Sequence, residues 1–121
     1  MIAKQPRLVA AGAINGALAV AAGAFGAHAL REHVSERAFA AFETAARYHM
    51  FHALAMVLAG LLAARSSGWI FQLGIVLFSG SLYVWAVADV HAMVFVTPFG
   101  GVAFLVGWIC LAICAFRASS D

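Results

Sequence analysis

The charged residues of this chain stand at the edges of long uncharged stretches, and this spacing constrains the fold more than any other feature. No Asp, Glu, Lys or Arg occurs in residues 8–30, 48–64, 66–88 or 90–116. A helix needs about 20 predominantly apolar residues to cross the hydrocarbon core of a bilayer. The four stretches therefore predict a polytopic membrane protein, with little of the chain left for any other domain.

The composition also indicates that most of the chain is surrounded by lipid. The chain has 121 residues, of which 65% are hydrophobic and 10% charged, whereas soluble domains carry about 25% charged residues. So much apolar surface requires lipid around it, and we expect the bilayer to be the main partner. The net charge is only +2 and no Lys/Arg cluster is present, so no nucleic-acid partner is expected. Cys110 and Cys114, one helical turn apart, suit helix packing better than a disulfide.

We predict a single all-α domain, a four-helix bundle in the membrane. The spans are expected at about residues 8–30, 48–64, 69–88 and 98–116. Residues 65–68 predict a polar turn before the third span. Thr97 and Pro98 predict the start of the last span, because Thr is a favoured N-cap and Pro a favoured first helical residue. Lys4 and Arg7 followed by an apolar run resemble the start of a signal peptide. The run is longer than the apolar region of a signal peptide, so we expect it to be retained as the first span.

The segment at about 35–47 differs from the spans. Phe39 and Phe42 share one helical face, while Glu36 and Glu43 share another. This pattern predicts a short interfacial amphipathic helix between the first two spans, with Ser35 as its N-cap.

Small residues recur at spacings of three and four in the first and last spans, a pattern that lets membrane helices approach closely. The expected packing positions are Gly12, Gly16, Gly23, Gly26, Gly100 and Gly107. We therefore expect the first and last spans to pack on each other or to form faces for self-association.

Four spans place both termini on one side of the membrane. That side holds four Lys and Arg residues (4, 7, 65 and 117) against three on the other (31, 37 and 47), which favours cytoplasmic termini. All five histidines and four of the five acids fall on or near the opposite side. Any site chemistry is expected at that face.

His49 and His52, three residues apart, could share a ligand, since imidazole binds metals and haem. The candidates for such a zinc, copper or haem site are His28, His49, His52 and His91. No Cys-x-x-Cys or His-Glu-x-x-His pattern supports a metal. The alternative is that these histidines are interfacial polar groups, and we expect no metal and no cofactor. A polar site within the spans would draw on Asn15, His28, His52, Ser79, Ser81 and Tyr83.

Nothing in the sequence fits nucleophilic catalysis. Ser79 and Ser81 lie within a span with no acid beside them, which favours helix packing over an active serine. No carboxylate lies within any span, which argues against a small proton-coupled multidrug exporter. We therefore expect that the protein is not an enzyme.

Four ordered motifs carry a resemblance to a known family. They are GAFGAHAL at 23–30, YHMFHAL at 48–54, LFSGSLY at 77–83 and TPFGG at 97–101, followed by Gly107 and Trp108. Together they resemble the domain-of-unknown-function 423 family of small bacterial membrane proteins, which is related to a small mitochondrial transmembrane protein of animals. The resemblance implies a four-span inner-membrane protein and brings no established activity. When the motifs are matched position by position, the resemblance implies that His28 and His52 are the family's motif histidines. It also implies that the family usually has Gln at position 49, where this chain has His.

From these observations we expect an uncharacterised integral membrane protein, a structural or accessory component that packs through Gly/Ala-rich helix faces as a homo-oligomer or within a larger complex. One alternative is a channel or carrier for a small solute or ion that uses His28 and His52. A second alternative is a metal- or haem-binding membrane protein. The expected location is the bacterial inner membrane, with several passes and both termini in the cytoplasm.

Overall fold

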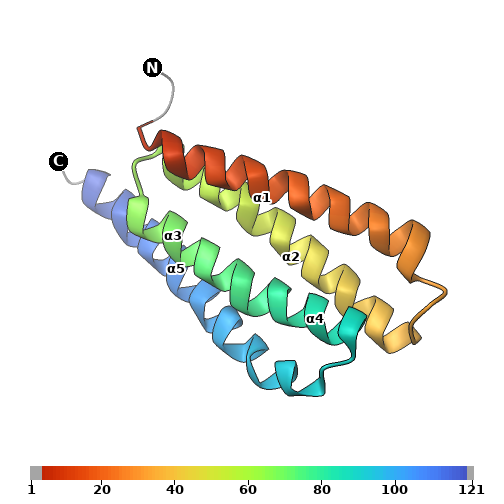
Figure 1. Ribbon diagram of the computed structural model, residues 1–121. Coiled ribbons are helices and arrows are strands. Elements are labelled where there is room, and N and C mark those ends of the chain that lie inside the picture. Colours follow the sequence, from red (N-terminus) through yellow and green to blue (C-terminus); the bar gives the residue numbers. More distant parts are fainter. Residues whose placement is uncertain (1–3, 120–121) are drawn as a thin grey trace.

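The computed structural model describes residues 4–119, in which the helices run up and down in chain order (Figure 1). Helix α1 continues through a π-helical turn, η1, and is followed by α2. Helices α3 and α4, joined by a second π-helical turn, η2, form one continuous rod that precedes the 3₁₀ turn η3 and helix α5. The elements are α1 (Pro6–Phe25), η1 (Gly26–Leu30), α2 (Glu36–Leu61), α3 (Arg65–Gly74), η2 (Ile75–Gly80), α4 (Ser81–Ala88), η3 (His91–Phe95) and α5 (Thr97–Ser119). The described residues contain no β-strand, and the all-α prediction is confirmed.

The helix ends follow local side-chain chemistry. The Ser35 hydroxyl accepts a hydrogen bond from the Ala38 amide at 3.1 Å, which makes Ser35 the predicted N-cap of α2. Asp89 ends α4 in the left-handed region, with φ of 56°, a conformation that Asp tolerates better than most residues. Helix α5 begins at Thr97, close to the predicted start of the last span. Thr97 is the first helical residue and its hydroxyl donates to the carbonyl oxygen of Met93, so the prediction that it is the N-cap is wrong.

Helix α1 packs along α2, and α5 packs along α3 and η2 (Figure 1). Gly12 permits the first contact, since a Cβ there would lie 2.9 Å from the carbonyl oxygen of Ala53. Gly107 faces the Phe71 ring in the second contact. The expectation that the first and last spans pack on each other is wrong, and self-association through their small-residue faces stays a prediction. A small-residue stripe shows that a helix is closely approached, but it does not show by which neighbour.

The six predicted packing glycines divide into two groups. Gly12, Gly26, Gly100 and Gly107 lie against neighbouring helices, where an added Cβ would meet other atoms at less than 3 Å. Gly16 and Gly23 have no such neighbour within 4 Å. These two glycines do not contribute to packing within the chain.

Two boundary predictions are corrected. Residues 36–61 form a single helix, so the amphipathic segment at 35–47 is the first half of α2 and is not a separate helix lying on the membrane. No Gly or Pro separates the two halves, and the helix therefore continues. Residues 65–68 form the first turn of α3, and the chain reverses just before them, where Ala63 has a φ of 61°.

In the part of the chain that the structure describes, three helical segments are long and apolar enough to cross a membrane: Pro6–Leu30, Arg65–Ala88 and His91–Ser119. Helix α2 is not among them, because its first half carries the charged residues and only residues 48–61 remain uncharged. The prediction of four spans is therefore not confirmed, since three candidate spans are found among residues 4–119. Large apolar side chains such as Ile14, Leu105 and Ile109 face outward, as expected where lipid is the solvent.

Candidate functional site

The centre of the bundle holds a cluster of hydrogen-bonded side chains around His49, which is only 5% exposed. Its Nδ1 atom lies 2.9 Å from the Tyr83 hydroxyl, and its Nε2 atom lies 3.0 Å from Oδ1 of Asn15. The Asn15 amide nitrogen donates to Oε1 of Gln72 at 2.8 Å and to the carbonyl oxygen of Ala11 at 2.9 Å. We call His49, Asn15, Gln72 and Tyr83 the central cluster.

The direction of each hydrogen bond follows from Asn15. Its amide nitrogen is used as a donor toward two oxygens, so its Oδ1 atom must accept. His49 therefore carries its proton on Nε2, and its bare Nδ1 accepts from the Tyr83 hydroxyl. With the imidazole neutral, both ring nitrogens of His49 are satisfied. A single directed chain of hydrogen bonds thus runs from Tyr83 through His49 and Asn15 to Gln72.

The central cluster joins helices that are distant in sequence. Asn15 lies on α1, His49 on α2, Gln72 on α3 and Tyr83 on α4. In an apolar surrounding a polar group without a partner is costly, so each member requires the others. The cluster consequently fixes the register of α1 and α2 against the α3–α4 rod.

His52, one turn along α2, belongs to a separate aromatic cluster. Its ring stacks on Phe104, with ring centroids 3.5 Å apart and an interplanar angle of 7°. Its Nδ1 atom lies 2.7 Å from the carbonyl oxygen of Tyr48, and the Trp108 indole donates to its Nε2 atom at 3.1 Å. His52 therefore carries its proton on Nδ1, the tautomer opposite to that of His49. It links α2 to α5.

The predicted serines make hydrogen bonds between and within helices. The Ser79 hydroxyl donates to the carbonyl oxygen of Ala45 at 2.8 Å, which joins η2 to α2. The Ser81 hydroxyl contacts the Thr97 hydroxyl and the carbonyl oxygen of Phe78. Neither serine has an acid or a histidine among its hydrogen-bond partners.

The structure does not gather the predicted histidines at one face. His28 and His91 are exposed at the end of the bundle opposite the start of α1, whereas His49 and His52 are buried in the bundle. His91 pairs with Asp89 at 3.0 Å, and both side chains are largely exposed. The prediction that all the histidines lie near the side opposite the termini is wrong for His49 and His52. The hydrogen bond between His49 and Asn15 places His49 at the level of the middle of α1.

The four metal candidates are likewise dispersed. Within residues 4–119 no group of three or more His, Cys, Asp or Glu side chains lies close enough to share a metal ion. His49 and His52 are neighbours on α2, but their ring nitrogens are directed to different partners.

Sequence reasoning missed Gln72 and understated His49. Gln72 is an amide side chain within an uncharged apolar stretch, the same signal that singled out Asn15. His49 was considered only as a metal or interfacial residue. Its partner Tyr83 lies 34 residues away, and helical periodicity does not specify a contact over that distance.

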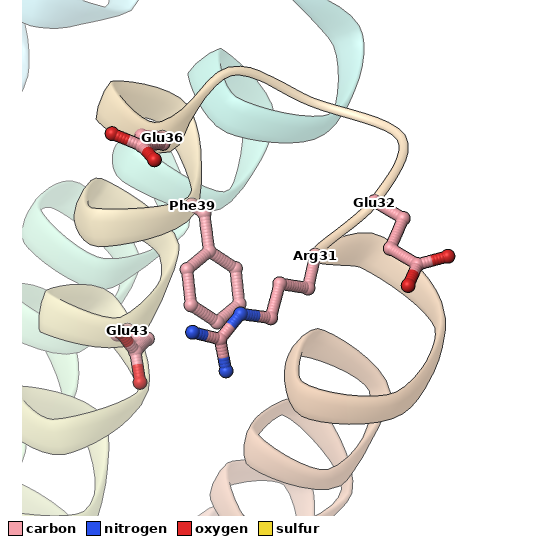
Figure 2. Close-up of a pocket in the computed structure, with 5 residues that line it drawn as sticks. All are labelled: Arg31, Glu32, Glu36, Phe39 and Glu43. Carbon is pink, nitrogen blue, oxygen red and sulfur yellow. The ribbon is translucent and has the colours of Figure 1, made fainter.

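A second polar feature is a surface cavity of about 470 Å³ where η1 meets α2 (Figure 2). Its lining residues are Arg31, Glu32, Glu36, Phe39 and Glu43. The Arg31 guanidinium lies 5.2 Å from the centroid of the Phe39 ring, a cation–π contact. Figure 2 shows Glu36, Phe39 and Glu43 one below another along α2, with Arg31, the residue after η1, reaching toward them.

The apolar helices and the buried hydrogen-bond clusters define a small helical integral membrane protein. The chain belongs to the DUF423 family, described as "Protein of unknown function", whose sequence profile matches residues 22–101. The predicted resemblance is thereby confirmed.

Curated relatives share this class. The chain is 41% identical over 114 residues to the UPF0382 membrane protein YwdK of Bacillus subtilis, covering 88% of this chain and 93% of the relative. It is 40% identical over 116 residues to a UPF0382 membrane protein of Haemophilus influenzae, covering 89% and 92%. No solved structure is significantly similar to the chain.

Proposed function

We propose that this membrane protein is a non-enzymatic structural or accessory component that self-associates through the outer face of α2. The observation that supports this proposal is the position of Arg47 and Glu43. Both are exposed on α2, and at the level of Arg47 the neighbouring α1 carries no charge.

The level of these residues follows from the register between α1 and α2. Asn15 bonds to His49, and Gly26 lies against Phe42. Arg47 lies between His49 and Phe42 on α2, and so its level falls between Asn15 and Gly26. That level is well inside the candidate span Pro6–Leu30.

An outward charge at this depth is costly in lipid, at about 2.5–3.5 kcal/mol for a central arginine on insertion scales. Glu43 and Arg47 are four residues apart and lie one turn from each other along α2. In a second copy inserted with the same orientation, they would lie at the same two levels. Glu43 of each copy would then face Arg47 of the other across a two-fold axis, and this self-complementary pairing removes both charges from lipid.

A charge-swap series on the full-length protein in detergent or nanodiscs tests this proposal. We expect native mass spectrometry of the wild type to show an oligomer, and Glu43→Arg or Arg47→Glu alone to shift it to monomer. The double variant Glu43→Arg/Arg47→Glu should restore the oligomer. Arg37→Glu, at the start of α2, is the matched control and should change nothing. A wild type that is only monomeric, with no co-purifying protein, would contradict the proposal.

The same register supports α2 as a fourth membrane-crossing helix. The Gln5 amide donates to the carbonyl oxygen of Gly60 at 2.9 Å at one end of the α1–α2 pair, and Gly26 meets Phe42 toward the other end. Since α2 follows α1 along its length, it crosses wherever α1 crosses.

We further propose the bacterial inner membrane as the location, with the start of α1 and the end of α5 in the cytoplasm. The residues that support this orientation are Lys4, Arg7, Arg65 and Arg117. They lie at or near the start of α1, the start of α3 and the end of α5, and Figure 1 shows these helix ends at the same end of the bundle. A C-terminal alkaline phosphatase fusion with strong activity would reverse the orientation.

The two alternative functions have less support. A carrier that relies on His28 and His52 together would need them close, but His28 is exposed beyond α1 and both ring nitrogens of His52 are occupied within the bundle. A metal or haem site would need free histidine nitrogens at the centre. His49 and His52 instead direct theirs to Asn15, Tyr83, Tyr48 and Trp108.

A further inference from the structure

Three side chains, Trp85, His91 and Asp89, form a hydrogen-bonded chain where α4 meets η3. Nε1 of the Trp85 indole donates to Nδ1 of His91 at 3.3 Å, and Nε2 of His91 lies 3.0 Å from Oδ1 of Asp89. The rings of Trp85 and His91 meet edge to face, with centroids 6.2 Å apart. An indole nitrogen can only donate, so Nδ1 of His91 must be bare and Nε2 must carry the proton. The bond from Trp85 therefore requires a neutral His91 ring.

Few other contacts hold η3 on α4. No residue of η3 is buried, and Asp89 links it to α4 in the left-handed conformation that ends the helix. Within residues 4–119, the bond from Trp85 to His91 is the only side-chain hydrogen bond between α4 and η3. The other end of η3 is tied to α5, because the Thr97 hydroxyl donates to the carbonyl oxygen of Met93. Loss of the Trp85 bond would therefore release one end of η3 and leave the other attached.

Among the described residues, Asp89 is the charged group that faces His91. The helices packed against η3 are α4 and α5. The titratable side chain of α4 is Tyr83, which binds His49. The titratable side chains of α5 lie in the second half of that helix, away from η3; they are Cys110, Cys114 and Arg117. A change in the charge of His91 is therefore felt first by its two neighbours in the chain, Trp85 and Asp89.

We propose that Trp85 and His91 form an acid-sensitive latch between α4 and η3. A proton taken up by His91 binds to Nδ1, which then becomes a donor and can no longer accept from Trp85. The protonated ring keeps Asp89 as its partner on Nε2, so only the link to α4 is lost. Histidine side chains change charge between about pH 5 and pH 8, so the latch is closed at neutral pH and opens in acid. The proposal goes beyond self-association through α2 and does not depend on it.

The test follows the indole N–H signals of the full-length protein in micelles by ¹⁵N NMR as the pH falls from about 7.5 to about 5.5. Trp85→Phe assigns the signal of Trp85. We expect this signal to move to the position of an indole without a protein acceptor, while those of Trp69 and Trp108 stay fixed. In His91→Gln the Trp85 signal should not respond to pH, because a glutamine oxygen accepts throughout this range. Asp89→Asn is the control for the carboxylate, and the response of Trp85 should persist in it.

Hydrogen exchange of the η3 amides measures whether the latch holds this turn on α4. At the acid end of the range, these amides should exchange about threefold faster in the wild type than in His91→Gln. At the neutral end the two proteins should exchange equally. Comparing them at the same pH removes the effect of pH on the intrinsic exchange rate.

Three results would overturn the proposal. The first is a Trp85 signal that does not move with pH in the wild type. The second is an equal pH response of this signal in His91→Gln. The third is equal exchange of η3 in the two proteins in acid, which would show that the bond does not hold η3. His91 is 75% exposed, so its replacement should leave the helical content by circular dichroism unchanged. If it does not, the wild-type titration alone decides.

Discussion

Nε2 of His49 on α2 lies 3.0 Å from Oδ1 of Asn15 on α1, and this contact sets the register of the two helices at mid-bundle. Because the Asn15 amide nitrogen already donates to Gln72 and Ala11, the contact also fixes which ring nitrogen of His49 holds the proton. The stability of the bundle should therefore depend on both residues.

Replacing Asn15 by leucine should destabilise the protein by about 1–2 kcal/mol, because it removes the acceptor for His49 and the donor for Gln72. The measurement is the midpoint of unfolding in mixed micelles of sodium dodecyl sulfate and a mild detergent. Ile14→Leu, on the exposed face of the same turn, is the control and should leave the midpoint unchanged. Equal midpoints for Asn15→Leu and wild type would show that the central cluster contributes nothing to stability.

His49→Gln should retain most of the stability that His49→Leu loses. A glutamine amide can donate to Asn15 and offer an oxygen to the Tyr83 hydroxyl, whereas leucine leaves both partners unsatisfied. The same micelle unfolding curve distinguishes the two variants, with about 1 kcal/mol expected between them. If leucine is tolerated as well as glutamine, the hydrogen bonds of His49 are dispensable.

Gly12→Ala should destabilise the α1–α2 pair by about 1–3 kcal/mol, because its Cβ would lie 2.9 Å from both Ala53 and Val57. Gly16→Ala is the matched control, one turn away on the same helix, and nothing lies within 4 Å of its Cβ. It should be neutral or slightly stabilising, since alanine favours helix over glycine. Equal effects of the two substitutions would contradict the observed packing of α1.

Trp108→Phe should loosen the contact between α2 and α5. It keeps an aromatic ring near Phe71 but removes the donor to Nε2 of His52, which then lacks a partner. The expected loss is about 1 kcal/mol by micelle unfolding. Trp69→Phe, with an exposed ring at the end of the bundle, should cost less. The reverse order would mean that the indole of Trp108 does not serve His52.

The apolar helices could be predicted from the spacing of charges alone. The helical segments end at Leu30 and Ala88 and α5 begins at Thr97, close to the expected limits, although the last candidate span already begins at His91. These limits are local, because each depends on a charge, a cap or a proline within a few residues. The start of α3 was missed, since Ser66 and Ser67 suit a turn and a first helical turn equally well.

The pairing of helices and the central cluster could not be predicted in the same way. Gly12 and Gly107 both indicate a closely approached helix, but only the three-dimensional structure shows that their neighbours are α2 and α3. Asn15 and Tyr83 stand out in the sequence as polar residues in apolar stretches. The sequence pattern of His49, which joins them, instead indicates a metal ligand or an interfacial polar group. Its contacts join residues 34 positions away in both directions, and such contacts depend on the tertiary fold.

The ring nitrogens of His49 and His52 are hydrogen-bonded to residues inside the bundle, so binding to other molecules is expected at the outer surface. ¹⁵N NMR of the histidine side chains in the full-length protein tests this most directly, with His49→Gln and His52→Gln spectra to assign the signals. We predict two neutral rings of opposite tautomer, with the proton on Nε2 in His49 and on Nδ1 in His52. A charged ring in His49 or His52 at neutral pH, or the same tautomer in both residues, would contradict the hydrogen-bond pattern described for the bundle interior.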